Sequence, residues 1–322
     1  MEKIDVKDRK ILYQLDLNSR QSFSRIGKKV GLHKDVVARR VKKLQEKGII
    51  KNFNTAINTS KLGFIPLRFY FKFQYAPPEI KEEIIDYFVK CKYIQFVHLI
   101  EGSQPHDVSL VISVKNLHKF YNFWEKILKK YLYYFDNLDF SVYVKTDVFG
   151  YTFLVDNNTE KKKYEFFGDV GYIDIDDFDN MILKLIVTDS RLPTIDIAKK
   201  LNSTAITVNN RIKKLLKSGV ILGFRANIDF QKIGYKWFKV FLNLKDYNDS
   251  NPIIDYLINN YDLHSVDRSI GNIDLQLHFI LKDVGQLHQI INDISNKFPD
   301  KIKNYTYHNV IKSYKWNYLP ED

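Results

Sequence analysis

The chain contains a single cysteine, Cys91, and lacks any long uninterrupted run of apolar residues. One cysteine excludes an intrachain disulfide framework and a cysteine-based zinc site. The apolar runs stay well below the ~18 residues that a membrane helix needs. The opening segment, MEKIDVKDRK, is charged and lacks the apolar stretch of an export signal. These absences predict a cytoplasmic protein with no membrane partner.

The motifs of common enzyme active sites are also absent. The sequence has no Walker-type phosphate loop, no Gly-x-Gly-x-x-Gly, no His-Glu-x-x-His and no Gly-x-Ser-x-Gly. The eight histidines are scattered, and none lies four residues from another, as a metal-binding pair on a helix would. We therefore expect no catalytic residue, no metal site, no cofactor and no enzyme activity.

Acidic residues are few relative to basic residues in the N-terminal part of the chain. The net charge is +12, and residues 1–52 contain fifteen Lys or Arg against six Asp or Glu, whereas residues 174–226 contain nine against six. Concentrated positive charge favours polyanions, because binding releases their counterions. A lysine-rich surface that only keeps the protein in solution is the alternative.

What the sequence does contain is an internal duplication. Residues 4–64 align without a gap on residues 175–235, at a constant offset of 171 residues. Identical residues recur at Asp5 and Asp176, Arg20 and Arg191, Arg40 and Arg211, Gly48 and Gly219, and Gly63 and Gly234. A solenoid repeat has a period of roughly 20–50 residues, so this is a duplicated module of larger size.

Each copy begins with three predicted short helices. In the first copy, apolar spacing predicts a helix over residues 5–16, and Ser22 can cap a second helix that Gly31 ends. A third helix runs from about Lys34 to Lys47 and stops at Gly48. The segment from Ile49 to Ile57 predicts a two-stranded wing. This plan is a winged helix-turn-helix, whose third helix enters the major groove of DNA.

The exposed face of each third helix supplies the residues that we expect to contact double-stranded DNA. They are Lys34, Arg39, Lys42 and Lys43 in the first head, and Thr204, Thr207, Asn210, Lys213 and Lys214 in the second. Arginine suits guanine and asparagine suits adenine, so Arg39 and Asn210 predict that the heads read different sequences. A solvated helix face is the alternative for the lysines.

Arg40 and Arg211 lie at the edge of the buried stripe of these helices. One interpretation is a DNA phosphate contact that sets the register. The other is an ion pair with an acid of the first helix, such as Asp8 or Asp179.

The second half of each copy follows the order β-α-β-β-α-β, the ferredoxin-like arrangement. Leu67 to Tyr75, for example, alternates apolar and polar residues as a strand does. The predicted fold class is therefore α+β, with two repeats. The predicted domains are two winged heads at 1–64 and 173–234, two ferredoxin-like domains at 65–155 and 235–322, and a linker at 156–172.

Several of these stretches resemble the Lrp/AsnC family of "feast-famine" transcription regulators. They include Arg40-Val41-Lys42-Lys43-Leu44, Lys61-Leu62-Gly63-Phe64, Arg211-Ile212-Lys213-Lys214-Leu215 and Lys232-Ile233-Gly234-Tyr235. The resemblance implies a winged helix-turn-helix joined to a ferredoxin-like effector domain, called the RAM domain. It also implies a regulator that binds promoter DNA and responds to a small molecule such as an amino acid.

Members of this family usually carry one such unit and dimerise through their sheets. Because two units are fused here, we expect the two effector domains to pack against each other as a pseudo-dimer within the chain. Exchange between chains is the alternative, and assembly of further copies stays open.

The resemblance also suggests an effector site at a Gly-x-x-Asp turn between the central strands. The second copy keeps this turn as Gly271 to Asp274, whereas two extra residues separate Gly102 and Asp107 in the first. Glycine would allow close backbone approach, and the carboxylate could hold an ammonium group. A tight turn that serves geometry alone is the alternative.

Two rival functions share this architecture. One is a DNA-compacting architectural protein with little sequence preference. The other resembles siroheme decarboxylases, which have a His-rich strand that leads into an Asn-x-Trp-Phe motif. That motif is missing after both His98 and His264, which we interpret as strand residues at a sheet surface.

Overall fold

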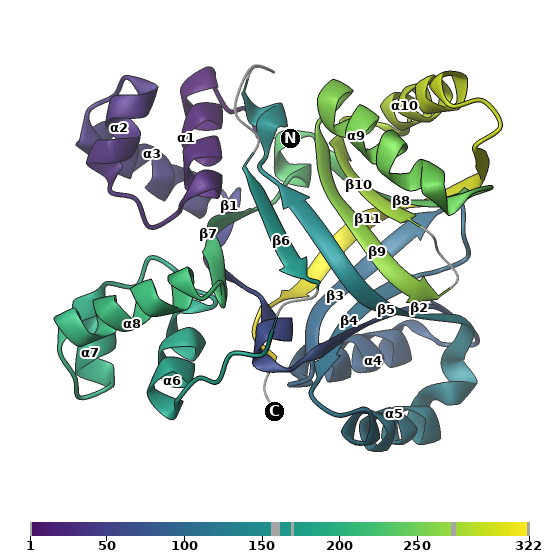
Figure 1. Ribbon diagram of the computed structural model, residues 1–322, viewed down its shortest axis with the longest axis horizontal. Coiled ribbons are helices and arrows are strands. Elements are labelled where there is room, and N and C mark those ends of the chain that lie inside the picture. Colours follow the sequence, from purple (N-terminus) through teal and green to yellow (C-terminus); the bar gives the residue numbers. More distant parts are fainter. Residues whose placement is uncertain (1, 156–161, 169–170, 272–274, 321–322) are drawn as a thin grey trace. The chain divides into compact units, whose positions relative to one another are not determined.

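The computed structural model describes residues 2–155, 162–168, 171–271 and 275–320. It divides into two units, and each unit draws on both copies of the duplicated module (Figure 1). The first unit comprises Met1–Asn58, Val148–Phe166 and Ile173–Tyr235, and the second comprises Thr59–Asp147, Phe167–Tyr172 and Lys236–Asp322. No described helix is both long enough and apolar enough to cross a membrane.

The first unit contains both heads, each with three helices. They are α1 (Val6–Leu17), α2 (Phe23–Val30) and α3 (Lys34–Glu46) in the first head, and α6 (Asp177–Ile186), α7 (Thr194–Lys200) and α8 (Ala205–Lys217) in the second. Asp5 caps α1 and Ser22 caps α2, each by accepting a hydrogen bond from a backbone N–H three residues later. The predicted helix-turn-helix plan is therefore confirmed in both heads.

The segment after α3 forms one strand, which corrects the predicted two-stranded wing. β1 (Ile50–Ile57) pairs antiparallel with β7 (Ile221–Ile228), the equivalent strand of the second head, and does not fold back on itself. The run KNFNTA inside β1 contains no Gly, no Pro and no Asn-Gly pair, so it cannot make the tight turn of a hairpin. The two heads therefore share a single two-stranded ribbon (Figure 1).

The predicted linker contains a strand that the sequence analysis missed. β6 (Lys163–Phe167) alternates charged residues with buried Tyr164 and Phe166, a period-two pattern that could have predicted it. The Tyr164 hydroxyl donates to the Leu17 carbonyl oxygen at 3.2 Å, so this segment packs on the first head. Residues 156–161 of the predicted linker lie outside the described residues.

The second unit contains the two ferredoxin-like halves in the predicted order. The first half consists of β2 (Ile65–Phe73), α4 (Pro78–Lys90), β3 (Ile94–Gly102), β4 (Val108–Val114), α5 (Leu117–Tyr131) and β5 (Phe135–Phe149). The second half consists of β8 (Lys236–Leu244), α9 (Ser250–Asn260), β9 (Leu263–Gly271), β10 (Leu275–Leu281), α10 (Val284–Lys297) and β11 (Ile302–Trp316).

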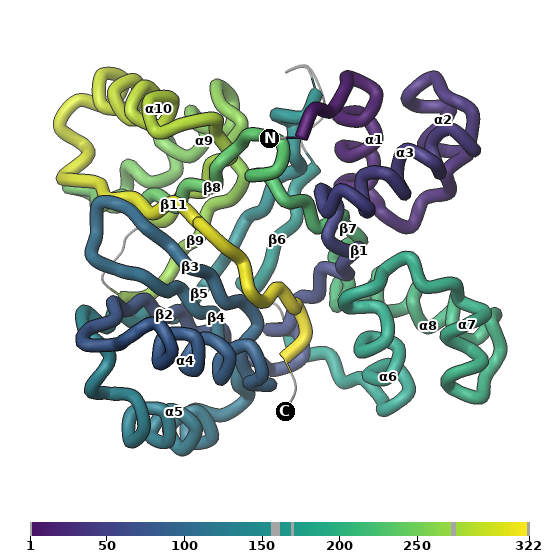
Figure 2. Tube along the Cα trace, turned by 180° about the vertical axis from the view of Figure 1, so that it is seen from behind, coloured from purple at the N-terminus to yellow at the C-terminus, as the bar shows by residue number. Residues whose placement is uncertain are grey.

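The strands of both halves join into one closed sheet. Their order is β5-β2-β4-β3-β11-β8-β10-β9, and β9 in turn pairs with β5. β11 pairs with β8 of its own half and with β3 of the other half, beside which it runs in Figure 2. β11 continues to Trp316 because its last residues pair with the other half.

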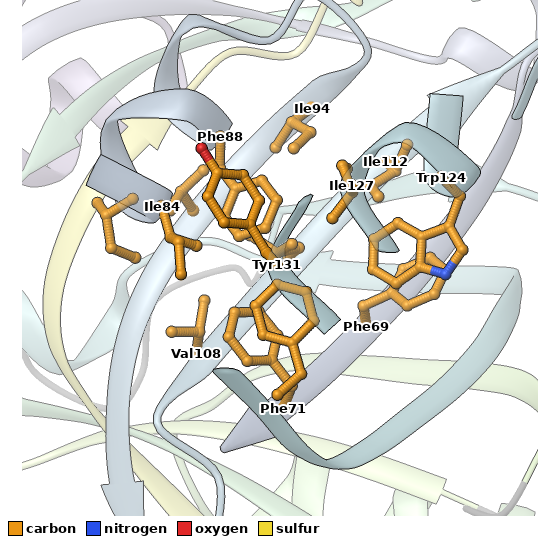
Figure 3. Packing of buried hydrophobic residues seen from close by; sticks show 14 of the residues in the cluster. Phe69, Phe71, Ile84, Phe88, Ile94, Val108, Ile112, Trp124, Ile127 and Tyr131 are labelled. Carbon is orange, nitrogen blue, oxygen red and sulfur yellow. The ribbon is translucent and has the colours of Figure 1, made fainter. Parts of the chain in front are cut away.

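The alternation along β2 separates an outer from an inner face of this sheet. Phe69 and Phe71 belong to the apolar core beneath α4 and α5 (Figure 3). Arg68 and Tyr70 take the alternate positions and are buried on the inner face, which the helices do not cover. The inner face is therefore the place where the two halves meet.

Candidate nucleic-acid interface

A tight turn precedes the third helix of each head. Gly31, with φ of 67°, and Asn202, with φ of 47°, occupy equivalent positions in this turn. Glycine adopts this left-handed conformation without strain, and asparagine tolerates it better than most residues. Buried stripes anchor the following helices, with Val37, Val41 and Leu44 in α3, and Val208, Ile212 and Leu215 in α8.

The opposite face of α3 carries the predicted DNA-contact residues. Lys34, Arg39, Lys42 and Lys43 are all exposed. Lys42 lies 3.8 Å from Glu46, whereas Arg39 and Lys43 have no hydrogen-bond or ion-pair partner within the described ranges. An exposed cation without an internal partner is available to an external anion such as a DNA phosphate.

The outer face of α8 is also exposed but is less charged. Thr204, Thr207, Asn210, Lys213 and Lys214 all lie on it. Thr204 is the N-cap of α8, because its hydroxyl accepts a hydrogen bond from the backbone N–H of Thr207 at 3.1 Å. Asn210 and Lys213 make no hydrogen bond or ion pair with the part of the chain that the structure describes.

Arg40 and Arg211 form ion pairs with acids of the first helix of their head, which is the second of the two interpretations given above. Arg40 Nη1 lies 2.7 Å from a carboxylate oxygen of Asp5 and 2.8 Å from one of Asp8. The hydrogen bond to Asp8 raises the pKa of Arg40. Arg211 repeats this arrangement with Asp176 at 2.5 Å and Asp179 at 3.3 Å. Both arginines therefore tie the third helix of their head to the first.

Partly buried contacts hold the two heads together beside the shared ribbon. Arg20 Nη1 donates to the Ser190 carbonyl oxygen at 2.6 Å, and Arg191 Nη1 donates to the Ser19 carbonyl oxygen. Each of these arginines also lies over an aromatic ring, Phe224 for Arg20 and Phe23 for Arg191. The duplicated Ser-Arg pair thus serves the joint between the heads.

A buried ion pair at this joint has no counterpart in the other copy. Arg225 of β7 bonds to Asp16 of α1 at 2.6 Å, and both side chains are almost completely buried. The positions equivalent to Asp16 and Arg225 hold Val187 and Asn54. Arg225 was not among the predicted site residues, although an arginine between the apolar residues Phe224 and Ala226 of β7 was a signal for a buried partner.

At the predicted effector site, the structure describes Gly271, while Asp274 lies outside the described residues. Gly271 has φ of 149°. A Cβ atom there would lie 2.8 Å from Cβ of Ser141 and 3.0 Å from the Phe140 carbonyl oxygen. Packing of β9 against β5 therefore leaves no room for a side chain at this position.

The inner face of the closed sheet carries two buried cations at equivalent positions. Arg68 of β2 donates to Oε1 of Gln276 in β10, and Lys239 of β8 donates to Oγ of Ser109 in β4 at 3.0 Å. Each cation thus bonds to a strand of the other half. Burial lowers the pKa of Lys239 to about 7, an effect that the carboxylate of Asp267 only partly offsets.

The histidines of the inner face are buried among aromatic rings. Trp237 Nε1 donates to Nδ1 of His278 at 3.0 Å, which leaves His278 Nε2, 2.9 Å from Asp267, to carry the proton. His98 and His264 are strand residues as interpreted, but they are buried against the Trp237 ring and not exposed. Within the described ranges, no three His, Cys, Asp or Glu side chains are grouped to hold a metal ion.

Comparisons with known proteins agree with the two heads. The AsnC-type helix-turn-helix domain matches residues 4–45, and a winged helix-turn-helix DNA-binding domain matches residues 175–221. An uncharacterized HTH-type transcriptional regulator of Pyrococcus abyssi is 30% identical over 131 residues, which are 40% of this chain and 86% of that protein. One of Pyrococcus furiosus is 50% identical over 64 residues, which are 20% of this chain but only 43% of that relative's length.

One solved structure resembles the chain over nearly its full length. It is the siroheme decarboxylase NirDL in co-complex with an iron-uroporphyrin III analogue, with a TM-score of 0.63 over 98% of this chain and 94% of that one. The two sequences are only 13% identical. This similarity establishes a common fold and carries no conclusion about activity.

Proposed function

The chain belongs to the Lrp/AsnC family of HTH-type transcriptional regulators, and from this premise we propose that it binds promoter DNA sequence-specifically through α3 and α8. The observation that carries the proposal is the exposed polar row on these two helices. Among the described residues, Arg39 and Lys43 have no hydrogen-bond or ion-pair partner, whereas the neighbouring Arg40 is held by two carboxylates. The chain thus separates cations that stabilise the head from cations that are available to DNA.

The two heads contribute unequally to this binding. The first head carries most of the excess positive charge and supplies most of the counterion release, and with it most of the affinity. The second head offers Asn210 where the first offers Arg39, and it contributes sequence discrimination more than electrostatic attraction. A single chain then supplies both DNA-binding heads that a dimer of one-unit chains supplies, and it binds an operator with two dissimilar halves.

A small molecule such as an amino acid modulates this binding in our proposal. The support is the family resemblance at Gly271 and Asp274, together with the position of Gly271 at the end of β9. The test is a thermal shift of the purified chain with each amino acid in turn. A rise in melting temperature that Asp274→Asn abolishes would support this site, and no rise with any of them would contradict it.

The experiment that tests the DNA proposal is a footprint on genomic fragments at moderate salt. A discrete protected site is the expected outcome. The matched control is the Arg39→Ala, Asn210→Ala double variant, in which the ion pairs of Arg40 and Arg211 remain intact. Loss of the discrete site in that variant would assign the recognition to the outer faces of α3 and α8.

The two rival functions predict other outcomes. Uniform coverage with strong salt dependence and no preferred site would indicate a DNA-compacting protein. We propose no decarboxylase activity, because β4 and β10 lack the Asn-x-Trp-Phe motif. A shift of the siroheme absorbance spectrum on mixing with the purified chain would contradict that part of the proposal.

A further inference from the structure

The second residue of the recognition helix differs in chemistry between the two heads. It is Asp35 in α3 and Ile206 in α8, at equivalent positions 171 residues apart. Both are strongly exposed, with 76% of the Asp35 side chain and 74% of Ile206 accessible. Neither residue packs in a core, so the difference between them is not needed to build the heads.

Each of these residues precedes a second exposed residue by one helical turn. Arg39 follows Asp35 by four positions, and Asn210 follows Ile206 by four. Residues four apart lie on the same face of a helix. No ion pair joins Asp35 to Arg39 in the part of the chain that the structure describes, where Asp35 contacts the exposed His33 instead. The first head therefore presents an Asp/Arg pair and the second an Ile/Asn pair.

The two pairs suit different base pairs in the major groove. Arginine donates to O6 and N7 of guanine, and aspartate accepts from the N4 amino group of cytosine. Asparagine bonds to N6 and N7 of adenine, and an apolar side chain contacts the C5-methyl group of thymine. Each pair thus matches both partners of one kind of base pair, G·C for Asp/Arg and A·T for Ile/Asn.

We propose that the operator is asymmetric, with a half-site that contains G·C pairs for the first head and a half-site that contains A·T pairs for the second. This inference rests on the proposed function, because it specifies the DNA that those heads read. Recognition of a cytosine amino group gives the exposed carboxylate of Asp35 a role in a head that otherwise carries excess positive charge. Asp35 disfavours thymine or guanine in place of this cytosine, because thymine O4 and guanine O6 are acceptors that repel a carboxylate.

The contacts between the two heads determine the direction in which the chain binds an asymmetric operator. The β1–β7 ribbon and the reciprocal arginine contacts hold both heads within one unit. A chain bound to such an operator therefore has one orientation on the DNA. A symmetric homodimer, with the same residues in both heads, could not distinguish the two directions.

The test begins with selection of sites from a random duplex pool by the full chain. Two half-sites of opposite base composition are expected. The selected duplex is then made with deoxyuridine in place of thymine in the A·T half-site, which removes only the C5-methyl groups. Loss of one buried methyl contact should weaken binding about fourfold.

The matched variants are Ile206→Ala and Asp35→Ala, at equivalent positions of the two heads. Ile206→Ala should bind the thymine and deoxyuridine duplexes equally, whereas Asp35→Ala should keep the fourfold difference. Asp35→Ala should instead lose discrimination against a C·G to T·A exchange in the G·C half-site.

The outcomes separate this inference from the function on which it rests. Absence of binding to any duplex would overturn the proposed function itself. Specific binding to two half-sites of the same composition would overturn only the inference, as would a deoxyuridine effect that persists in Ile206→Ala. Circular dichroism of both variants establishes that the heads remain folded.

Discussion

Ser19 and Ser190 hydrogen-bond to each other through their side-chain hydroxyls at 2.6 Å, although 171 residues separate them. The same offset relates the two copies of the module, so this bond joins equivalent residues. A contact between equivalent residues lies on the pseudo-twofold axis that relates the two heads. Both serines are completely buried, which makes the bond a structural element of the joint.

We expect Ser19→Ala to destabilise the protein by about 1–3 kcal/mol, because it leaves the Ser190 hydroxyl buried without its partner. The Ser19→Ala, Ser190→Ala double variant should lose less than the sum of the single variants, since it leaves no unpaired hydroxyl. Urea unfolding of the four proteins measures this coupling. Additive losses would show that the two hydroxyls act independently.

The buried pair of Asp16 and Arg225 offers a second test with a control that the chain itself provides. Arg225→Asn should cost about 3–5 kcal/mol of unfolding free energy, because it leaves the Asp16 carboxylate buried without a counter-charge. Adding Asp16→Val gives the residue pair that the other copy uses at these positions and should restore part of the loss. If the double variant unfolds as easily as Arg225→Asn alone, the unpaired carboxylate is not the cause.

Lys239 should make stability depend on pH. Its folded pKa of about 7 lies below the unfolded value of about 10.4. Between these values the unfolded chain binds a proton that the folded chain does not, so the free energy of unfolding rises with pH from about 7 to about 10. Lys239→Met should reduce this rise, which urea unfolding at pH 7 and pH 9 measures.

The control for the Lys239 variant is Lys199→Met, which removes one exposed lysine from the second head. It should leave the pH dependence of the wild-type protein unchanged. Equal slopes for the wild-type protein and Lys239→Met would contradict burial of a titrating ammonium group.

Arg39 and Lys43 should differ in what they contribute to DNA binding. Arg39→Ala should cost about 1–3 kcal/mol on the preferred site and relax specificity at one base position. Lys43→Ala should weaken binding equally on all sequences and reduce the salt slope by about one. Fluorescence anisotropy on specific and mutated duplexes at several salt concentrations measures both effects. An equal loss on all sequences for Arg39→Ala would make it a phosphate contact.

Fusion of the two modules allows an asymmetry that identical subunits cannot have. Asp267 places a carboxylate on the inner face of β9, whereas His98 takes the corresponding place on β3. In a symmetric dimer both places would hold the same residue. The same holds for Asp16 with Arg225, which the other copy replaces by Val187 and Asn54. Each copy can therefore lose a charge that the other retains.

Much of the fold could be predicted from local signals in the sequence. Asp5, Ser22 and Gly31 act within three or four residues of their own position, so they mark helix ends wherever the helices finally pack. The alternation along β2 likewise separates an apolar face from a polar one. For the same reason, the exposed rows of α3 and α8 could be named before their positions were known.

The sequence by itself determined the duplication, the helical heads, the ferredoxin-like order and the candidate DNA-contact faces, because each depends on short-range spacing. Only the tertiary structure decided that β1 pairs with β7, that β11 joins β3, and that Arg225 reaches Asp16. A strand pairs with any strand of suitable register, so its choice of partner depends on the packing of the whole unit. The joint between the two heads, and with it their common orientation, therefore belongs to the fold and not to any local motif.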